Sequence, residues 1–198
     1  MRLTDEVGLI GSGSLGLGLS HPLDCHVYVL DGGDDLALVD LGTGLHTERM
    51  LELARADGYD LARLRHAFVT HPHADHAGGA RSWVDATGLQ VAAHPQCAAF
   101  IRAADEHGFN LDVARAAGRY PADYVLEPLA QVRELDDGEE MRIGHLRVRT
   151  IYTPGHSVGA ACFFVQGRER SYLFTGDTLF YGGKVLILSS DDSSVVEL

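Results

Sequence analysis

The chain has 198 residues, of which 45% are hydrophobic and 22% are charged, a composition typical of one globular domain and not of a disordered segment. Sixteen Lys and Arg residues against 28 Asp and Glu residues give a formal net charge of −12. This charge argues against nucleic acid and against an anionic membrane as partners, because both would repel the chain on average.

The first part of the chain predicts strands that alternate with a helix. Residues 7–18 alternate apolar residues with glycine and serine, which predicts a strand pair closed by a tight turn. Residues 25–30 and 36–41 are β-rich runs, and the DGGDD between them predicts a hairpin. Apolar residues at helical spacing predict a helix over 46–57, and 64–70 follows as a buried strand. A strand, a helix and a strand in this order indicate an α/β layered fold.

The second part of the chain predicts helices first and then a run of strands. Helices are expected over 77–87 and 95–106, with a strand over 90–94 between them. Residues 108–130 are broken by prolines, and we expect them to form an irregular cap over a site. The order of the predicted strands and helices is compatible with a single domain over 1–198, in which two β-sheets pack together with helices outside. The remaining strands are expected over 131–134, 139–143, 145–153, 160–166 and 171–175.

The stretch VTHPHADHAGG, residues 69–79, holds three histidines and an aspartate at the end of a predicted strand. Side chains two residues apart lie on one side of an extended segment, so His71 and His73 can hold one ion together. Asp75 shares that parity, and His76 lies in the turn into the next helix, where it can face a second ion. A lone histidine is usually a hydrogen-bonded or exposed side chain, and that interpretation is kept for His21, His26, His46, His66, His94, His107 and His145.

Two later strand ends add one possible ligand each. His156 lies in the turn TPGHS after the run 145–152, and Asp177 lies in FTGDT after the run 171–174. Either residue alone would be a turn residue or a cap, but together with the first cluster they indicate a metal centre. Imidazole and carboxylate ligands without a nearby cysteine suit zinc, and also iron or manganese.

Four segments carry a resemblance to a known family: LALVDLGTG (36–44), VTHPHADHAGG (69–79), TPGHSVGA (153–160) and LFTGDTLFYGG (173–183). With them the sequence resembles the metallo-β-lactamase-fold hydrolase superfamily, and its glyoxalase II-like and lactonase-like branch in particular. The resemblance implies an α/β fold, the αββα sandwich. It also implies that His71, His73 and His156 hold one zinc, that Asp75 and His76 help to hold a second, that Asp177 bridges both, and that Asp40 supports the site from behind.

One departure from the family pattern lies near the C-terminus. Such hydrolases supply a further histidine on a late strand-end turn, and no histidine follows His156 here. Another helix, strand and helix usually follow this region, so we expect a truncated chain that lacks its last helix and strand elements. The missing histidine leaves three alternatives: a weakly bound second metal, a ligand from a partner chain, or chemistry with a single metal. An uncovered sheet edge also favours a homo-oligomer.

The expected function is hydrolysis of a small-molecule thioester, ester or lactone by a metal-activated hydroxide. Asp75 would either orient this hydroxide or protonate the leaving group of the substrate. Against glyoxalase II itself, the turn after His156 reads SVGAACF and lacks the usual Gly-His. Tyr181 and Lys184 are candidate substrate contacts, although a solvated lysine at a strand end is the preferred interpretation of Lys184. Tyr120 and Tyr124 either cover the substrate pocket or pack in the protein interior.

Two alternatives stay open. His71, His156 and Asp177 form a two-histidine, one-carboxylate set that suits non-haem iron, as in the persulfide dioxygenases of the same fold. The second alternative is a non-catalytic remnant, a truncated fold that is used for interaction. As for the compartment, three scattered cysteines without a CxxC pair, and an N-terminus unlike a signal peptide, predict a cytoplasmic protein.

Overall fold

The computed structural model describes residues 1–185. Within this range the chain forms two β-sheets and five α-helices, which confirms the predicted α/β class. The expectation that the last helix and strand elements of the sandwich are missing concerns residues 186–198 and beyond, and it lies outside the described residues.

The larger sheet has six strands in the order β1-β2-β3-β4-β5-β6. Strands β1 to β3 pair antiparallel, whereas β3 to β6 pair parallel because helices connect them. The predicted hairpin at DGGDD joins β2 to β3, with Asp31 opposite Leu36. The strands are β1 Val7–Gly11, β2 Val27–Asp31, β3 Leu36–Val39, β4 Leu64–Val69, β5 Gln90–Ala93 and β6 Val132–Glu134.

The smaller sheet has four antiparallel strands in the order β10-β9-β8-β7. Along β8 the residues alternate between buried and exposed, as expected for a strand with one face against a core. The strands are β7 Glu140–Ile143, β8 Leu146–Tyr152, β9 Ala161–Gln166 and β10 Ser171–Phe174.

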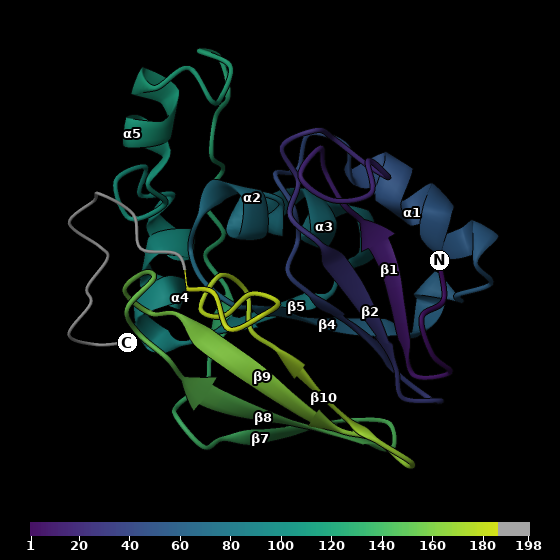
Figure 1. The fold of residues 1–198 in the computed structure, drawn as a ribbon. Coiled ribbons are helices and arrows are strands. Elements are labelled where there is room, and N and C mark those ends of the chain that lie inside the picture. Colours follow the sequence, from purple (N-terminus) through teal and green to yellow (C-terminus); the bar gives the residue numbers. More distant parts are fainter. Residues whose placement is uncertain (186–198) are drawn as a thin grey trace.

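Helices cover the larger sheet on the side that faces away from the smaller sheet (Figure 1). Among residues 1–185 no helix covers the outer face of the smaller sheet, so this range supplies three of the four layers of the expected sandwich. The helices are α1 Thr47–Ala56, α2 Ala74–Ala77, α3 Ala80–Thr87, α4 Pro95–Ala103 and α5 Leu111–Ala116, with one turn of 3-10 helix at Leu61–Arg63.

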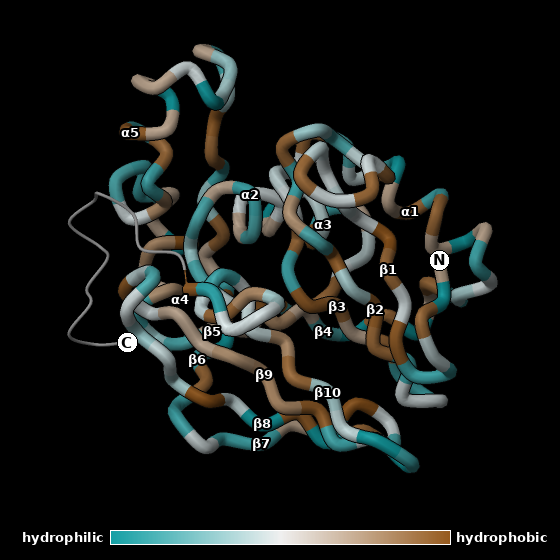
Figure 2. The backbone as a smooth tube through the Cα atoms, in the orientation of Figure 1, coloured by the Kyte–Doolittle hydropathy of each residue, from teal (hydrophilic) through white to brown (hydrophobic). Residues whose placement is uncertain are grey.

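The two faces of the larger sheet bury separate apolar clusters. One cluster packs helices α1, α3 and α4 onto the sheet, with Met50, Trp83 and Ile101 almost completely buried. The other fills the space between the sheets, where the rings of Phe68 and Phe163 lie 5.2 Å apart. Figure 2 shows the hydrophobic residues concentrated along the strands of the larger sheet.

Three predicted elements differ from the structure. Residues 7–18 do not form a strand pair, because β1 pairs with β2 and the glycine-rich segment after it folds into turns closed by hydrogen bonds to Ser12 and Gly13. The helix predicted over 77–87 begins only at Ala80, as α3, and the short helix α2 precedes it. Gly79, between the two, packs so closely on the Leu41 carbonyl that a Cβ would lie 2.3 Å from its oxygen. The segment 108–130, expected to be irregular, contains the helix α5, Leu111–Ala116.

The parallel strands determine where polar side chains gather. The carboxyl ends of β3 and β4 lie at the same edge of the larger sheet, so Asp40 and the histidine-rich loop that begins at Thr70 are neighbours. In Figure 1 the turn that follows β10, drawn in yellow, lies beside α2 at this edge. None of the helices within residues 1–185 has the length and apolar character needed to cross a membrane.

Candidate metal centre

Six candidate ligands come from four places in the chain and meet at one edge of the sandwich. His71 and His73 lie in the loop after β4, and Asp75 and His76 lie in α2. His156 comes from the turn between β8 and β9, and Asp177 from the turn after β10. The two sheets therefore contribute different members of the cluster.

Three of the histidines form a compact, buried group. His71, His73 and His156 each offer a ring nitrogen, and these atoms lie within 4.8 Å of one another. The Nε2 atom of His156 lies 3.1 Å from Nδ1 of His73. Both His71 and His156 are 1% exposed. Three imidazoles that face one point from two strand ends have the spacing of ligands to a single ion.

A second group shares His71 and adds His76 and Asp177, again with ligand atoms within 4.8 Å of one another. One carboxylate oxygen of Asp177 lies 3.4 Å from Nε2 of His76, and the other lies 3.7 Å from Nε2 of His156. Asp177 thus stands between the two groups, at the position where a carboxylate can bridge two ions.

Asp75 is placed differently from the expectation. It does not share one side of an extended segment with His71 and His73, because the chain turns into α2 at Ala74. Its carboxylate instead lies 3.5 Å from Nε2 of His76, and its side chain remains 35% exposed. Asp75 therefore borders the second group from the solvent side.

The charges within the cluster divide its members into neutral and charged groups. Burial, reinforced by His76, His73 and His156, lowers the pKa of His71 well below its ordinary value, so this imidazole is neutral. Burial opposes ionisation of Asp177, but the neighbouring His76 and His156 outweigh it and lower the pKa of the carboxyl to about 2. Burial would also lower the pKa of His76, yet the carboxylates around it, Asp75, Asp40 and Asp177, raise that pKa above its ordinary value.

Asp40 supports the histidines from behind, as the resemblance implied. Its carboxylate accepts a hydrogen bond from Nδ1 of His76 at 2.8 Å and one from the backbone N–H of Thr70 at 2.8 Å. Asp40 is 3% exposed and has a φ of 61°, in the left-handed region that few residues other than glycine adopt. A residue kept in this conformation at the end of a strand indicates that its side chain is needed there.

Two residues beside the cluster did not figure in the sequence analysis as part of the site. The Thr70 hydroxyl lies 3.0 Å from Nδ1 of His71, and its place directly before that histidine in the motif was the available signal. The Cys25 thiol lies with Asp40 and His76 in a third group of close ligand atoms. Burial raises the pKa of Cys25 to about 12, so the thiol is protonated in the metal-free protein at neutral pH.

The donor set fits a divalent metal ion. Nε2 of His71 is buried and has no hydrogen-bond partner, which is costly for a polar atom unless a further partner completes the site. Imidazole nitrogens and a carboxylate are the ligands that zinc, iron and manganese share. The fit rests on residues from both sheets, and all six sequence-predicted ligands lie in or beside the cluster.

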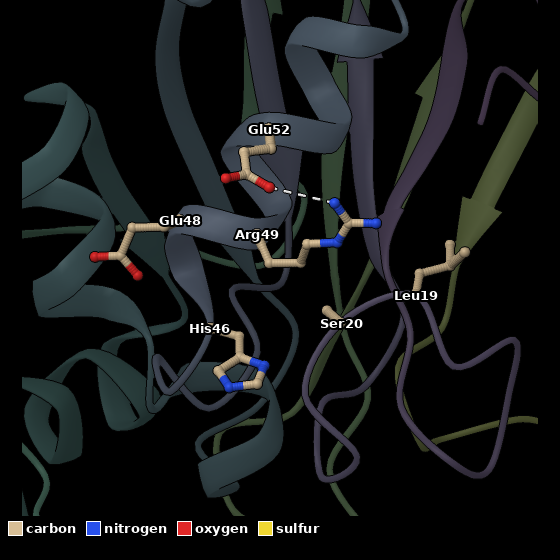
Figure 3. A pocket seen from close by; sticks show the side chains of 6 residues that line it. All are labelled: Leu19, Ser20, His46, Glu48, Arg49 and Glu52. Atoms are coloured by element: carbon tan, nitrogen blue, oxygen red, sulfur yellow. Dashed lines mark hydrogen bonds and ion pairs between the residues drawn. The ribbon is translucent and has the colours of Figure 1, made fainter.

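Other candidate residues lie away from this arrangement. Tyr124 is packed into the helix-side core and donates its hydroxyl hydrogen to the Thr43 carbonyl, which agrees with a packing role. Tyr181 is 99% exposed, and Lys184 is exposed as well. A surface hollow of about 460 Å³ beside α1 contains none of the candidate ligands, and Figure 3 shows two of its charged side chains, Arg49 and Glu52, paired with each other.

Known proteins share this fold and these segments. An uncharacterised protein of Mycobacterium leprae is 33% identical over 161 residues, which cover 80% of this chain and 69% of that protein. A hydroxyacylglutathione hydrolase of Anaeromyxobacter dehalogenans is 34% identical over 160 residues, so the match covers 81% of this chain but only 48% of the hydrolase.

A solved metallo-β-lactamase from Cronobacter sakazakii has the same fold, with a TM-score of 0.72 and 20% identity over 87% of this chain and 62% of that one. The chain thus spans about half to two thirds of the length of these relatives. The family model of the metallo-β-lactamase superfamily matches residues 21–196. Since that match covers most of the sequence and includes every candidate ligand, the chain belongs to the metallo-β-lactamase superfamily.

Proposed function

We propose that the chain is a metal-dependent hydrolase that cleaves a thioester, an ester or a lactone, with two zinc ions per chain. The observation that carries the proposal is the buried, unpartnered Nε2 atom of His71 at the junction of the two ligand groups. An imidazole that stays neutral at this place keeps its lone pair available for a cation. His73 and His156 complete the first group, and His76 and Asp177 the second.

Bound zinc ions would lower the pKa of a water molecule to about 7 and polarise a carbonyl group. The residues of the chain then have separate tasks. Asp177 remains ionised and joins the two ligand groups. Asp75, at the exposed side, would orient the attacking hydroxide or pass a proton to the leaving group. No serine or cysteine nucleophile is required, and the raised pKa of the Cys25 thiol agrees with that.

The choice of substrate class is supported by the name of a relative. Hydroxyacylglutathione hydrolase, 34% identical, is named for a substrate whose acyl group is carried on the sulfur of glutathione. Because that relative is about twice as long as the matched region, the glutathione part of its substrate is not transferred to this chain. The acyl thioester, with esters and lactones as the related carbonyl compounds, is the part that the ligand set explains.

Two variants and a metal analysis test the proposal. His73→Ala should lose the bound metal and the hydrolysis of a thioester and lactone panel together, because it removes a ligand from the first group. His94→Ala is the matched control, since His94 stacks on Tyr152 at 4.0 Å between ring centres and belongs to neither ligand group. It should retain the metal and the activity.

Three outcomes would contradict the proposal. A His73→Ala variant with its full metal content would show that the ligand scheme is wrong. One iron per chain with oxygen consumption would favour the persulfide dioxygenase, which needs only His71, His156 and Asp177. Metal retention without turnover of any thioester, ester or lactone would favour a non-catalytic role.

A further inference from the structure

We propose that the Thr70 hydroxyl is a positioning group that fixes the tautomer of His71 and so keeps the metal-facing nitrogen of this imidazole unprotonated. The inference rests on the metal centre of the proposed function and adds a residue to it. Thr70 lies between the end of β4 and the histidine loop and is 1% exposed. Its hydroxyl oxygen lies 3.0 Å from Nδ1 of His71 and 2.9 Å and 3.0 Å from the two carboxylate oxygens of Asp40.

Counting hydrogens assigns the donors in this chain of contacts. A carboxylate only accepts hydrogen bonds, so the single hydroxyl hydrogen of Thr70 goes to Asp40. The hydroxyl oxygen can then only accept hydrogen bonds. Nδ1 of His76 lies 3.5 Å from it but donates to Asp40 at 2.8 Å, so Nδ1 of His71, at 3.0 Å, carries the hydrogen that the hydroxyl oxygen accepts. A neutral imidazole with a hydrogen on Nδ1 has a lone pair on Nε2, which is the buried atom without a partner.

The rest of the structure holds Thr70 in this orientation. Its backbone N–H donates to Asp40, and its carbonyl oxygen accepts from the N–H of Ala161 in β9 at 2.8 Å. Gly176, the neighbour of Asp177, packs so closely that a Cβ there would lie 2.5 Å from the Thr70 hydroxyl oxygen. The side chain is therefore confined by segments from both sheets, and its hydroxyl has little freedom to turn away from Asp40.

Asp40 consequently orients two ligands through one carboxylate. It contacts His76 directly, at Nδ1, and it reaches His71 through Thr70. In each case the contact is made by Nδ1, so Nε2 is the nitrogen directed to the ligand groups. Groups that orient a metal ligand in this way typically change the metal affinity by about 10–100-fold when they are removed.

The test compares Thr70→Val, which keeps the shape but removes the hydroxyl, with Thr70→Ser, which restores the hydroxyl. Long-range ¹H–¹⁵N NMR spectra of metal-free wild-type protein report which ring nitrogen of His71 is protonated. We expect the hydrogen on Nδ1 in the wild-type protein and in Thr70→Ser, and a shift toward Nε2 in Thr70→Val. Zinc affinity, measured by competition with a chromophoric chelator, should fall by about 10–100-fold in Thr70→Val and recover in Thr70→Ser.

Several results would overturn the inference. A wild-type His71 protonated on Nε2 would mean that the Thr70 hydroxyl donates to the histidine instead of to Asp40. A folded Thr70→Val variant with wild-type zinc affinity would show that the hydroxyl does not position the ligand. The wild-type tautomer needs no variant, so a misfolded Thr70→Val does not remove the test. A failure of the proposed function is distinguishable, because a protein that binds no zinc still has a measurable His71 tautomer.

Discussion

Replacing Asp40 with alanine should destabilise the metal-free protein strongly, because the carboxylate is a buried acceptor with several donors. The backbone N–H of Thr70 and Nδ1 of His76 both point at it, at 2.8 Å each. Both residues are buried, so water cannot take over either hydrogen bond. The Thr70 hydroxyl donates to the same carboxylate and would add to the loss, so these two donors alone give a lower bound.

The expected size follows from these contacts. Each buried donor left without an acceptor costs about 1–3 kcal/mol, which gives roughly 2–6 kcal/mol for the two. The left-handed backbone at φ 61° adds about 1 kcal/mol, because aspartate tolerates this conformation better than alanine does. A loss of about 3–7 kcal/mol would be a large part of the 5–15 kcal/mol that is typical of a folded domain.

Urea denaturation of the metal-free protein, followed by circular dichroism, measures the change. Asp40→Gly is the matched control, since glycine has no strain at positive φ but also lacks the carboxylate. It should recover about 1 kcal/mol relative to Asp40→Ala and no more. If Asp40→Ala unfolds within about 1 kcal/mol of wild type, the carboxylate is not a structural acceptor and the reasoning fails.

Two further predictions concern other parts of the molecule. Glu6 is 8% exposed and accepts hydrogen bonds from the Arg168 N–H, from His145 and from Tyr172. Burial alone would raise the pKa of Glu6, but these hydrogen bonds outweigh burial and lower it. The ionised Glu6 therefore stabilises the fold at pH values above the unfolded pKa of about 4.3. This stabilisation is lost as the pH falls through the lower pKa of the folded state. Glu6→Gln should therefore cost about 1–3 kcal/mol in urea melts at neutral pH, with the difference closing under acid conditions, and a difference independent of pH would contradict the assignment. Gly176→Ala should weaken zinc binding in the same chelator competition, because its backbone has a φ of 47° and its Cβ would press on Thr70; unchanged affinity would show that the turn adjusts without moving Asp177.

The sequence was sufficient to locate the candidate metal centre because its possible ligands are unusual at strand ends. His71, His73 and His76 stand in one short motif, and His156 and Asp177 each follow an apolar strand, so pattern alone brought them together. Most strand positions were also predictable, since alternation and turn residues are local features.

What the sequence could not provide were interactions across long separations. Residues 7–18 have the alternation of a hairpin, but the partner of β1 lies beyond the segment, in β2, and the glycines allow turns that no local rule distinguishes. Asp75 was assigned by strand parity, which ended when the chain entered α2 one residue earlier. The contact of Thr70 with Asp40 joins residues thirty positions apart, and it depends on the parallel pairing of β3 and β4.

The possible ligands of the candidate metal centre are divided between the two sheets. His71, His73 and His76 belong to the larger sheet, whereas His156 and Asp177 belong to the smaller one, and the apolar layer with Phe68 and Phe163 sets the spacing between them. A substitution in that layer would shift one sheet, with its ligands, against the other without touching any ligand. A core substitution in this layer should therefore lower the affinity for the metal ion before it unfolds the chain.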